Sequence, residues 1–228
     1  MPPLKYAAPQ RLGSLLIENA INKYKLIEIN YEVLMSHCHL LDKYVLKLLP
    51  EDLDNLLMLD VGCGRGGWGQ ILRAKKRGFP RLIGIDVWRP HLENLCRTKV
   101  YSDLIAVNAP NLPLKDKCVD IILACEILEH LTKDAGYALL AELERVCRKI
   151  IIISTPLNWP QGEIYGNPYE RHVSEWRAED LARLGYNVHI ISVEHSSWAA
   201  GIANRVRGLL FRIPRNAQII LAYKLLEH

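Results

Sequence analysis

The stretch LDVGCGRGG, residues 59–67, decides the fold of this chain. It continues the short apolar run 56–59 and precedes a segment of helical periodicity, so it predicts a buried strand that enters a helix through a glycine loop. Glycines at such a turn let the backbone reverse sharply and approach a ligand that any Cβ would obstruct.

Segments of strand and helix periodicity alternate on the C-terminal side of this loop. Helices are predicted over 68–76, 91–98 and 133–147, and strands over 81–85, 104–107, 119–124 and 150–153. Such alternation is typical of right-handed βαβ units and a mostly parallel sheet. Two late strands, 188–193 and 218–223, lack this rhythm and predict an antiparallel pair at the sheet edge.

The length of 228 residues and a hydrophobic content of 50% suit one α/β domain over residues 1–228. Helical spacing over 12–49 predicts an N-terminal helical cap, residues 1–50, that ends at Pro50. Residues 226–228 are interpreted as the remnant of an expression tag. No signal peptide or membrane-spanning run is recognised, and the six scattered cysteines favour free thiols, so we expect a cytoplasmic protein.

An acidic residue, Asp86, ends the strand that follows the glycine loop. A carboxylate at this distance suits hydrogen bonds to the ribose hydroxyls of a bound nucleoside. The loop glycines also fit the dinucleotide pattern GxGxxG, but Asp60 would then face a pyrophosphate of like charge. The same carboxylate is favourable in front of a cationic amino group, so the sequence predicts a cationic nucleoside cofactor rather than NAD.

These residues resemble motif I and the following acidic motif of class I S-adenosylmethionine-dependent methyltransferases, specifically the type-11 group. The resemblance continues through residues 108–114, 118–120, 126–131 and 186–188. It implies a Rossmann-like sheet of seven strands in the order 3-2-1-4-5-7-6 with helices on both faces, and S-adenosyl-L-methionine as cofactor. The cofactor-binding positions that it implies are Asp60, Gly62, Gly64, Asp86, Val87, Asn108, Ala109 and Cys125.

Asn108 departs from the family pattern, which usually has an aspartate near the adenine amino group. The side-chain carbonyl of an asparagine still accepts that hydrogen bond, without the assistance of a charge.

A second group of polar residues follows the strand 119–124. If the chain leaves this strand as a helix, Glu126, Glu129 and His130 project from one face. His172 is the last residue of a long segment, 155–172, which we interpret as a lid over the substrate. His130 and His172 are candidate catalytic bases. With Glu126 and Glu129 they are also candidate ligands of a divalent cation, which would orient and acidify a hydroxyl.

This set resembles two groups of metal-using methyltransferases. Enzymes that 2′-O-methylate the 3′ end of small RNAs share the Glu-x-x-Glu-His run, the Ser-Thr-Pro of 154–156, and a later histidine before Glu-Trp. The catechol O-methylating enzymes of quinone synthesis share the Glu-His run. Many type-11 enzymes carry a Leu-Glu-His sequence and a later histidine without a metal, so a divalent cation is one alternative and a hydrogen-bonding or base role is the other.

The sequence therefore predicts methyl transfer to an O or N atom of a small-molecule acceptor. The first alternative is metal-assisted 2′-O-methylation of an RNA end, which the modest net charge of +4 and the lack of an appended RNA-binding domain disfavour. The second is a catalytically silent sensor or partner subunit that binds S-adenosylmethionine. The basic segment 198–215 is compatible with a lipid surface, a phosphorylated substrate or a cover for the sheet edge. The acceptor and the oligomeric state are not determined by the sequence.

Overall fold

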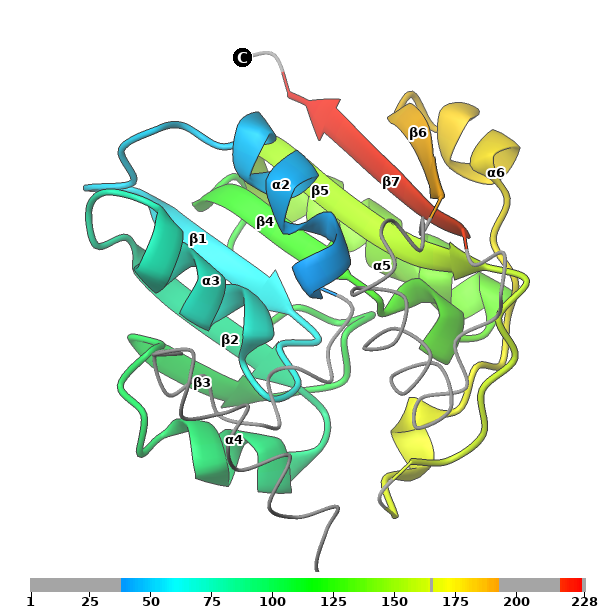
Figure 1. Ribbon diagram of the computed structural model, residues 1–228, viewed down its shortest axis with the longest axis horizontal. Helices are drawn as coiled ribbons and strands as arrows, with labels where there is room; N and C mark the ends of the chain where they lie inside the picture. Colours follow the sequence, from blue (N-terminus) through cyan, green and yellow to red (C-terminus); the bar gives the residue numbers. More distant parts are fainter. Residues whose placement is uncertain (1–37, 165, 193–217, 227–228) are drawn as a thin grey trace, which may run out of the picture.

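The computed structural model describes residues 38–164, 166–192 and 218–226. They form a seven-stranded sheet in the order β3-β2-β1-β4-β5-β7-β6, which confirms the predicted order (Figure 1). The strands are β1 (Leu57–Val61), β2 (Arg81–Asp86), β3 (Asp103–Ala106), β4 (Val119–Cys125), β5 (Cys147–Leu157), β6 (Asn187–Ser192) and β7 (Gln218–Leu225).

The pairing of the strands confirms a mostly parallel sheet with an antiparallel edge. β1 pairs in parallel with β2 and β4, β2 with β3, and β4 with β5. β7 runs antiparallel to both β5 and β6. The carboxyl ends of β1 to β5 therefore meet at one edge of the sheet, where ligands bind in open α/β folds.

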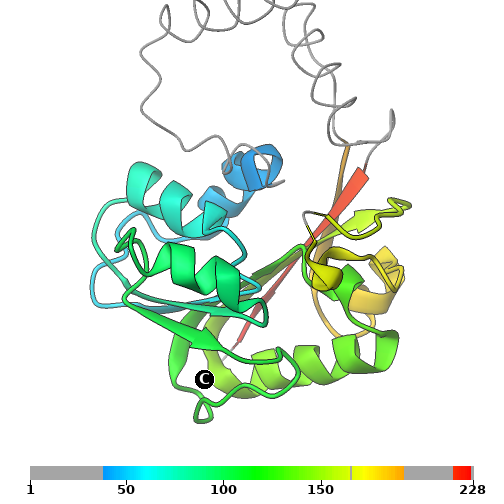
Figure 2. The same cartoon turned by 90° about the horizontal axis from the view of Figure 1, so that it is seen from below.

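Helices cover both faces of this sheet (Figures 1 and 2). They are α2 (Cys38–Leu48), α3 (Gly67–Lys75), α4 (Arg89–Leu95), α5 (Lys133–Val146) and α6 (Ala178–Ala182). α2, α3 and α4 contribute to one buried cluster, and α5 and α6 to the other. Successive residues of β4 alternate between the clusters, Ile121 and Leu123 in the first and Ile122 and Ala124 in the second.

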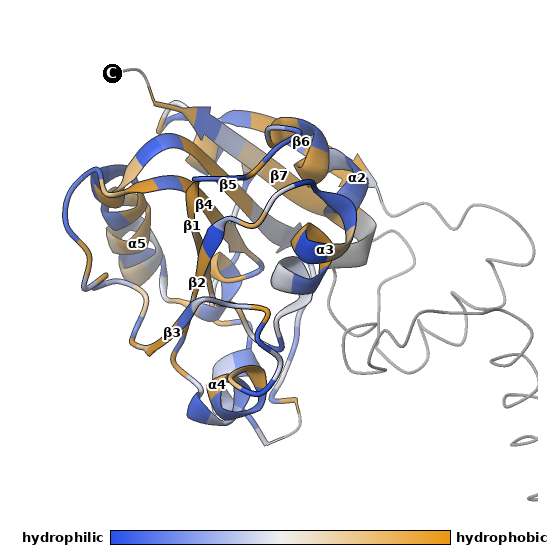
Figure 3. Ribbon diagram, turned by 90° about the vertical axis from the view of Figure 1, so that its left-hand side faces the viewer, coloured by the Kyte–Doolittle hydropathy of each residue, from blue (hydrophilic) through white to orange (hydrophobic). Residues whose placement is uncertain are grey.

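Burial on both faces explains the unbroken apolar runs that predicted the strands. Every residue of β4 is buried, and Figure 3 shows the central strands mostly in the hydrophobic colours. A strand that packs helices on both sides needs apolar residues at consecutive positions rather than at alternate ones.

The boundaries differ from the predictions mainly at β5. This strand extends from Cys147 to Leu157, beyond the predicted 150–153, because β7 pairs with it up to Leu157↔Gln218. The first three residues of the predicted lid therefore belong to the sheet. Leu226, interpreted as part of a tag remnant, donates its backbone N–H to the carbonyl of Lys149 (2.8 Å) and packs against the core.

Two predicted features fall partly or wholly outside the described residues. Of the predicted N-terminal cap, α2 is described, and its Leu41 and Val45 are fully buried. The rest of the cap before residue 38 and the basic segment 198–215 lie outside. Within the described part of the chain, no helix has the length and apolar composition needed to span a bilayer.

Candidate functional site

The glycine loop between β1 and α3 has the tight geometry that its sequence predicts. Gly62, Gly64 and Gly66 have φ of 73°, 50° and 81°, a left-handed region that side chains disfavour. The N–H of Gly62 donates to the carbonyl of Ile85 at the end of β2 (2.8 Å). A Cβ on Gly62 would lie 2.9 Å from Cδ1 of Ile127. The loop is therefore folded closely against the ends of β2 and β4.

Asp86, the last residue of β2, connects this loop to the next turn. Its Oδ2 accepts the N–H of Gly64 (2.8 Å) and its Oδ1 accepts the N–H of Trp88 (2.7 Å). Nδ1 of His91 lies 3.7 Å from Oδ2. Asp86 is 8% exposed and lies beside the glycine loop. Contact with a ribose stays a prediction.

Asp60 has a partner that the sequence analysis missed. Its carboxyl is almost completely buried and its Oδ2 accepts the hydroxyl of Tyr101 (2.6 Å). Burial raises the pKa of Asp60 to about 7, although the Tyr101 hydrogen bond lowers it. A methionine amino group near Asp60 stays a prediction.

Glycines make the room for this tyrosine. A Cβ on Gly69 would lie 2.7 Å from the Tyr101 ring, and a Cβ on Gly84 or Gly66 would also crowd it. Glycines at these positions indicate that a bulky side chain packs against them, but nothing in the sequence identifies that side chain as Tyr101.

The chain does not leave β4 as a continuous helix. Glu126 has a left-handed φ of 56°, and a short 3₁₀ turn, η2 (Leu128–His130), begins after it. The condition for placing Glu126, Glu129 and His130 on one helical face is therefore not met. Ser154 donates its hydroxyl to Oε1 of Glu126 (2.7 Å). Thr155 donates its hydroxyl to Oε2 of Glu129 (3.0 Å), and successive residues of a strand point to opposite faces.

Glu129, His130 and His172 come together at this edge. One possible ligand atom of each lies within 4.8 Å of the others, and the two imidazole rings meet edge to face at 4.9 Å between centroids. Glu129 is 2% exposed, and its Oε1 has no hydrogen-bond partner among the described residues. Burial raises the pKa of Glu129 well above its ordinary value, and the carboxylate of Glu126 raises it further.

The backbone of the 155–172 segment orients both imidazoles. Nδ1 of His130 lies 3.2 Å from the carbonyl oxygen of Arg171, and Nδ1 of His172 lies 2.5 Å from that of Trp159. A carbonyl only accepts hydrogen bonds, so Nδ1 carries the proton in each neutral ring and Nε2 is the basic nitrogen. Nε2 of His130 lies 3.9 Å from Oε1 of Glu129.

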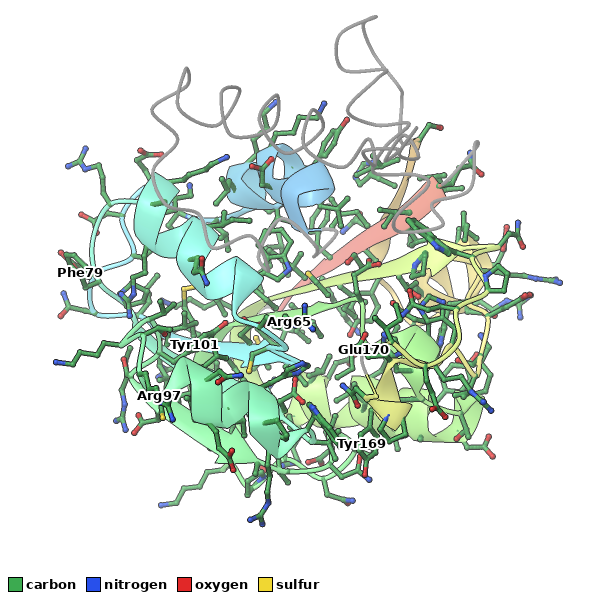
Figure 4. All side chains as sticks on the ribbon, turned by 60° about the horizontal axis from the view of Figure 1, so that its bottom comes forward. Arg65, Phe79, Arg97, Tyr101, Tyr169 and Glu170 are labelled. Atoms are coloured by element: carbon green, nitrogen blue, oxygen red, sulfur yellow. The ribbon has the colours of Figure 1, made fainter. Side chains whose placement is uncertain are left out.

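The same segment also reaches the part of the edge that follows β2. Its 3₁₀ turn η3 (Pro168–Glu170) presents Tyr169, which is 51% exposed and whose ring lies 6.1 Å from that of Trp88. Trp88 follows Asp86 by two residues. In Figure 4, Tyr169 and Glu170 lie across from Arg65 of the glycine loop.

Comparisons with known proteins indicate which family the glycine loop and the sheet belong to. Residues 59–152 match the family model described as a methyltransferase domain of the type-11 group. Residues 59–152 thus belong to a methyltransferase domain of the class I, S-adenosylmethionine-dependent type. S-adenosylmethionine is the cofactor of this family, and the resemblance read from the sequence is confirmed.

The curated relatives that match this chain share 28% to 30% of the aligned residues in the two examples that follow. A probable S-adenosylmethionine-dependent methyltransferase of Mycolicibacterium smegmatis is 28% identical over 132 residues, which cover 56% of this chain and 49% of the relative. A ubiquinone biosynthesis O-methyltransferase of Rhodopseudomonas palustris is 30% identical over 115 residues, 47% of this chain and 43% of the relative. The chain thus spans about half the length of the curated relatives it matches.

A solved structure shares the fold. A crystal structure of a SAM-dependent methyltransferase from Archaeoglobus fulgidus superimposes with a TM-score of 0.53 at 20% identity, covering 86% of this chain and all of that one.

The remaining predicted cofactor positions of the methyltransferase lie at the same carboxyl edge. Val87 directly follows β2, Asn108 and Ala109 follow β3, and Cys125 is the last residue of β4. Ala109 and Cys125 are buried. The fold thus gathers positions that are far apart in sequence, while their contacts with the cofactor stay predictions.

Proposed function

We propose that this methyltransferase transfers the methyl group of S-adenosylmethionine to an O or N atom of a small-molecule acceptor. The observation that carries the proposal is the position of His130 and His172. Both imidazoles lie at the carboxyl edge that also bears the glycine loop and Asp86, and both direct Nδ1 to a backbone carbonyl. This arrangement supports a basic Nε2 beside the methyl donor.

The chemistry required of the chain is alignment and proton removal. A lone pair of the acceptor atom attacks the methyl carbon, the C–S bond breaks, and its electron pair stays on sulfur to give S-adenosylhomocysteine. The proton of the acceptor hydroxyl or ammonium passes to Nε2 of His130 or His172. The buried Trp159 and the 155–172 segment would exclude water from this space.

The name of one relative favours oxygen as the acceptor atom. The Rhodopseudomonas palustris protein is a ubiquinone biosynthesis O-methyltransferase, and its matched region is 30% identical to this chain. We therefore place hydroxylated aromatic compounds first among acceptors to test.

Binding of S-adenosylhomocysteine tests the cofactor site. Titration calorimetry is expected to show binding to the wild type that Asp86→Asn weakens by about tenfold or more, because Asp86 holds the loop through Gly64. The matched control is Asp103→Asn, an exposed carboxylate paired with Arg81. No binding by the wild type at millimolar product, or equal affinity in Asp86→Asn, would contradict the proposed site.

Methyl transfer itself tests the two bases. With catechols, phenols, amines and an RNA 3′ end as acceptors, His130→Gln and His172→Gln are expected to lower kcat while S-adenosylhomocysteine binding is retained. The factor expected of a lost general base is about 10² to 10⁴. Unchanged kcat in both variants would refute the base role, and absence of transfer to any acceptor would favour the silent binding protein.

A second candidate is metal-assisted O-methylation, which the cluster of Glu129, His130 and His172 favours. One carboxylate and two imidazoles are donors that suit a divalent transition metal, and the buried Oε1 of Glu129 lacks a hydrogen-bond partner among the described residues. The residues therefore fit a cation, which would orient an acceptor hydroxyl and lower its pKa when bound. Mn²⁺ titration of the wild type and of Glu129→Gln tests this candidate. If the enzyme is metal-assisted, the wild type binds Mn²⁺ and Glu129→Gln binds it more weakly.

A further inference from the structure

We propose that Thr155 is a positioning residue that sets the carboxylate of Glu129 for the cluster with His130 and His172. The inference rests on the metal-assisted candidate for this site. Thr155 is fully buried in β5, and its hydroxyl donates to Oε2 of Glu129 at 3.0 Å. With Oε2 engaged in this way, Oε1 is the oxygen that faces Nε2 of His130, at 3.9 Å.

The backbone around Thr155 is fixed by the sheet. Thr155 pairs with Ile220 of β7, and the preceding Ser154 pairs with both Leu221 of β7 and Cys125 of β4. A β-branched side chain in a strand has few χ1 rotamers. The hydroxyl oxygen is therefore held in one place by covalent geometry and by the ladder, so it can orient a flexible carboxylate.

The backbone of Glu129 is held from the other side. Its carbonyl accepts the N–H groups of Val173 (2.8 Å) and Ser174 (3.2 Å). The segment after His172 therefore fixes the main chain of Glu129. These backbone hydrogen bonds leave the side-chain torsions of Glu129 unconstrained. The Thr155 hydrogen bond supplies the constraint on the carboxylate, as outer partners commonly do for metal-ligating groups.

The chain contains its own matched control. Ser154 makes the chemically equivalent bond, hydroxyl to carboxylate, with Glu126 at 2.7 Å. The three-residue cluster does not include Glu126, and Ser154 points to the opposite face of β5. Removing the Ser154 hydroxyl therefore perturbs the same strand end and a neighbouring carboxylate, while the hydrogen bond from Thr155 to Glu129 stays in place.

The experiment measures Mn²⁺ binding to the full chain by titration calorimetry in Thr155→Val, Thr155→Ser and Ser154→Ala. Thr155→Val keeps the shape and removes the donor, so we expect Mn²⁺ affinity to fall by about 10-fold to 100-fold. Thr155→Ser restores the hydroxyl and Ser154→Ala leaves Glu129 held, so both are expected to stay within about threefold of the wild type. Thermal unfolding and S-adenosylhomocysteine binding verify that each variant is folded.

A second readout separates positioning from general damage. In Thr155→Val, the Mn²⁺ concentration that gives half-maximal methyl transfer should rise, while kcat at saturating Mn²⁺ should stay near that of the wild type. A merely structural role would lower the unfolding temperature without moving this concentration.

Three results would overturn the inference. The first is wild-type Mn²⁺ affinity in folded Thr155→Val, and the second is an equal loss in Ser154→Ala, which would make the effect common to the strand end. The third is the absence of Mn²⁺ binding by the wild type. This result would refute both the metal-assisted candidate and the positioning role of Thr155. S-adenosylhomocysteine binding and methyl transfer to the acceptors then decide the broader methyltransferase proposal separately.

Discussion

Replacing Asp60 with asparagine should remove a specific pH dependence of stability. The carboxyl is fully buried, and burial raises its pKa from 3.8 to about 7. In the folded chain it stays protonated up to about neutral pH, whereas in the unfolded chain it ionises near 3.8. The folded state therefore binds more protons between these values, and stability falls as pH rises through this window and levels off above it.

The magnitude follows from the size of the shift. Each pKa unit corresponds to about 1.4 kcal/mol, so the wild type should lose about 3 kcal/mol between pH 5 and pH 8 through Asp60 alone. The amide of Asp60→Asn does not titrate, and its oxygen still accepts the Tyr101 hydroxyl. The free energy of unfolding of the variant, minus that of the wild type, should therefore increase by about 3 kcal/mol over this range.

Urea unfolding at pH 5, 6, 7 and 8 measures this difference without cofactor. Other titrating groups contribute to both proteins and largely cancel. Tyr101→Phe is the companion variant, because loss of the donated hydrogen bond should push the pKa of Asp60 higher and extend the fall in stability to higher pH. A difference between Asp60→Asn and the wild type that stays constant from pH 5 to pH 8 would refute the reasoning.

Three substitutions test the packing around the two parts of the site. In Gly62→Ala the alanine must adopt φ near 73° with its Cβ 2.9 Å from Ile127. Thermal and urea unfolding should therefore show that the free energy of unfolding falls by about 2 kcal/mol. Gly162→Ala, with open space around the added Cβ, should show no loss. Gly136→Ala would bring a Cβ to 2.3 Å from the ring of Trp176 and should cost about 1 to 3 kcal/mol by the same assay; wild-type stability would contradict this packing. Trp176→Phe loses the indole N–H that donates to the η2 backbone at 3.1 Å. The free energy of unfolding should fall by about 1 to 3 kcal/mol, and kcat should also fall. Unchanged values of both would refute the idea that Trp176 supports η2.

The fold was largely predictable because its signals are local. A glycine loop after an apolar run, and strands alternating with helices, specify βαβ units through turn chemistry and periodicity within short windows. The seven-stranded order came from the family resemblance, and the antiparallel edge from the break in rhythm after residue 188. The length of β5 was underestimated, because pairing with β7, some 70 residues later in the chain, extends it to Leu157.

The residues of the candidate site could be predicted from the sequence, but their positions relative to one another could not. The motif residues Asp86, Glu129, His130 and His172 were identified by type and spacing, which is information that a sequence carries. Their orientation depends on partners that have no sequence signature, since a backbone carbonyl is present at every residue. Those of Arg171 and Trp159 face the two imidazoles only because the segment after β5 folds back over η2.

The sequence by itself determined the fold class, the cofactor family and the set of titratable residues at the carboxyl edge. The tertiary structure alone decided that Glu126 has a left-handed backbone and lies outside the cluster of Glu129, His130 and His172. It also decided that Tyr101 reaches Asp60 and that Thr155 meets Glu129. The physical reason is range. Backbone periodicity and glycine turns act between near neighbours, whereas these contacts join residues 26 to 41 positions apart that are brought together by the register and packing of the completed sheet.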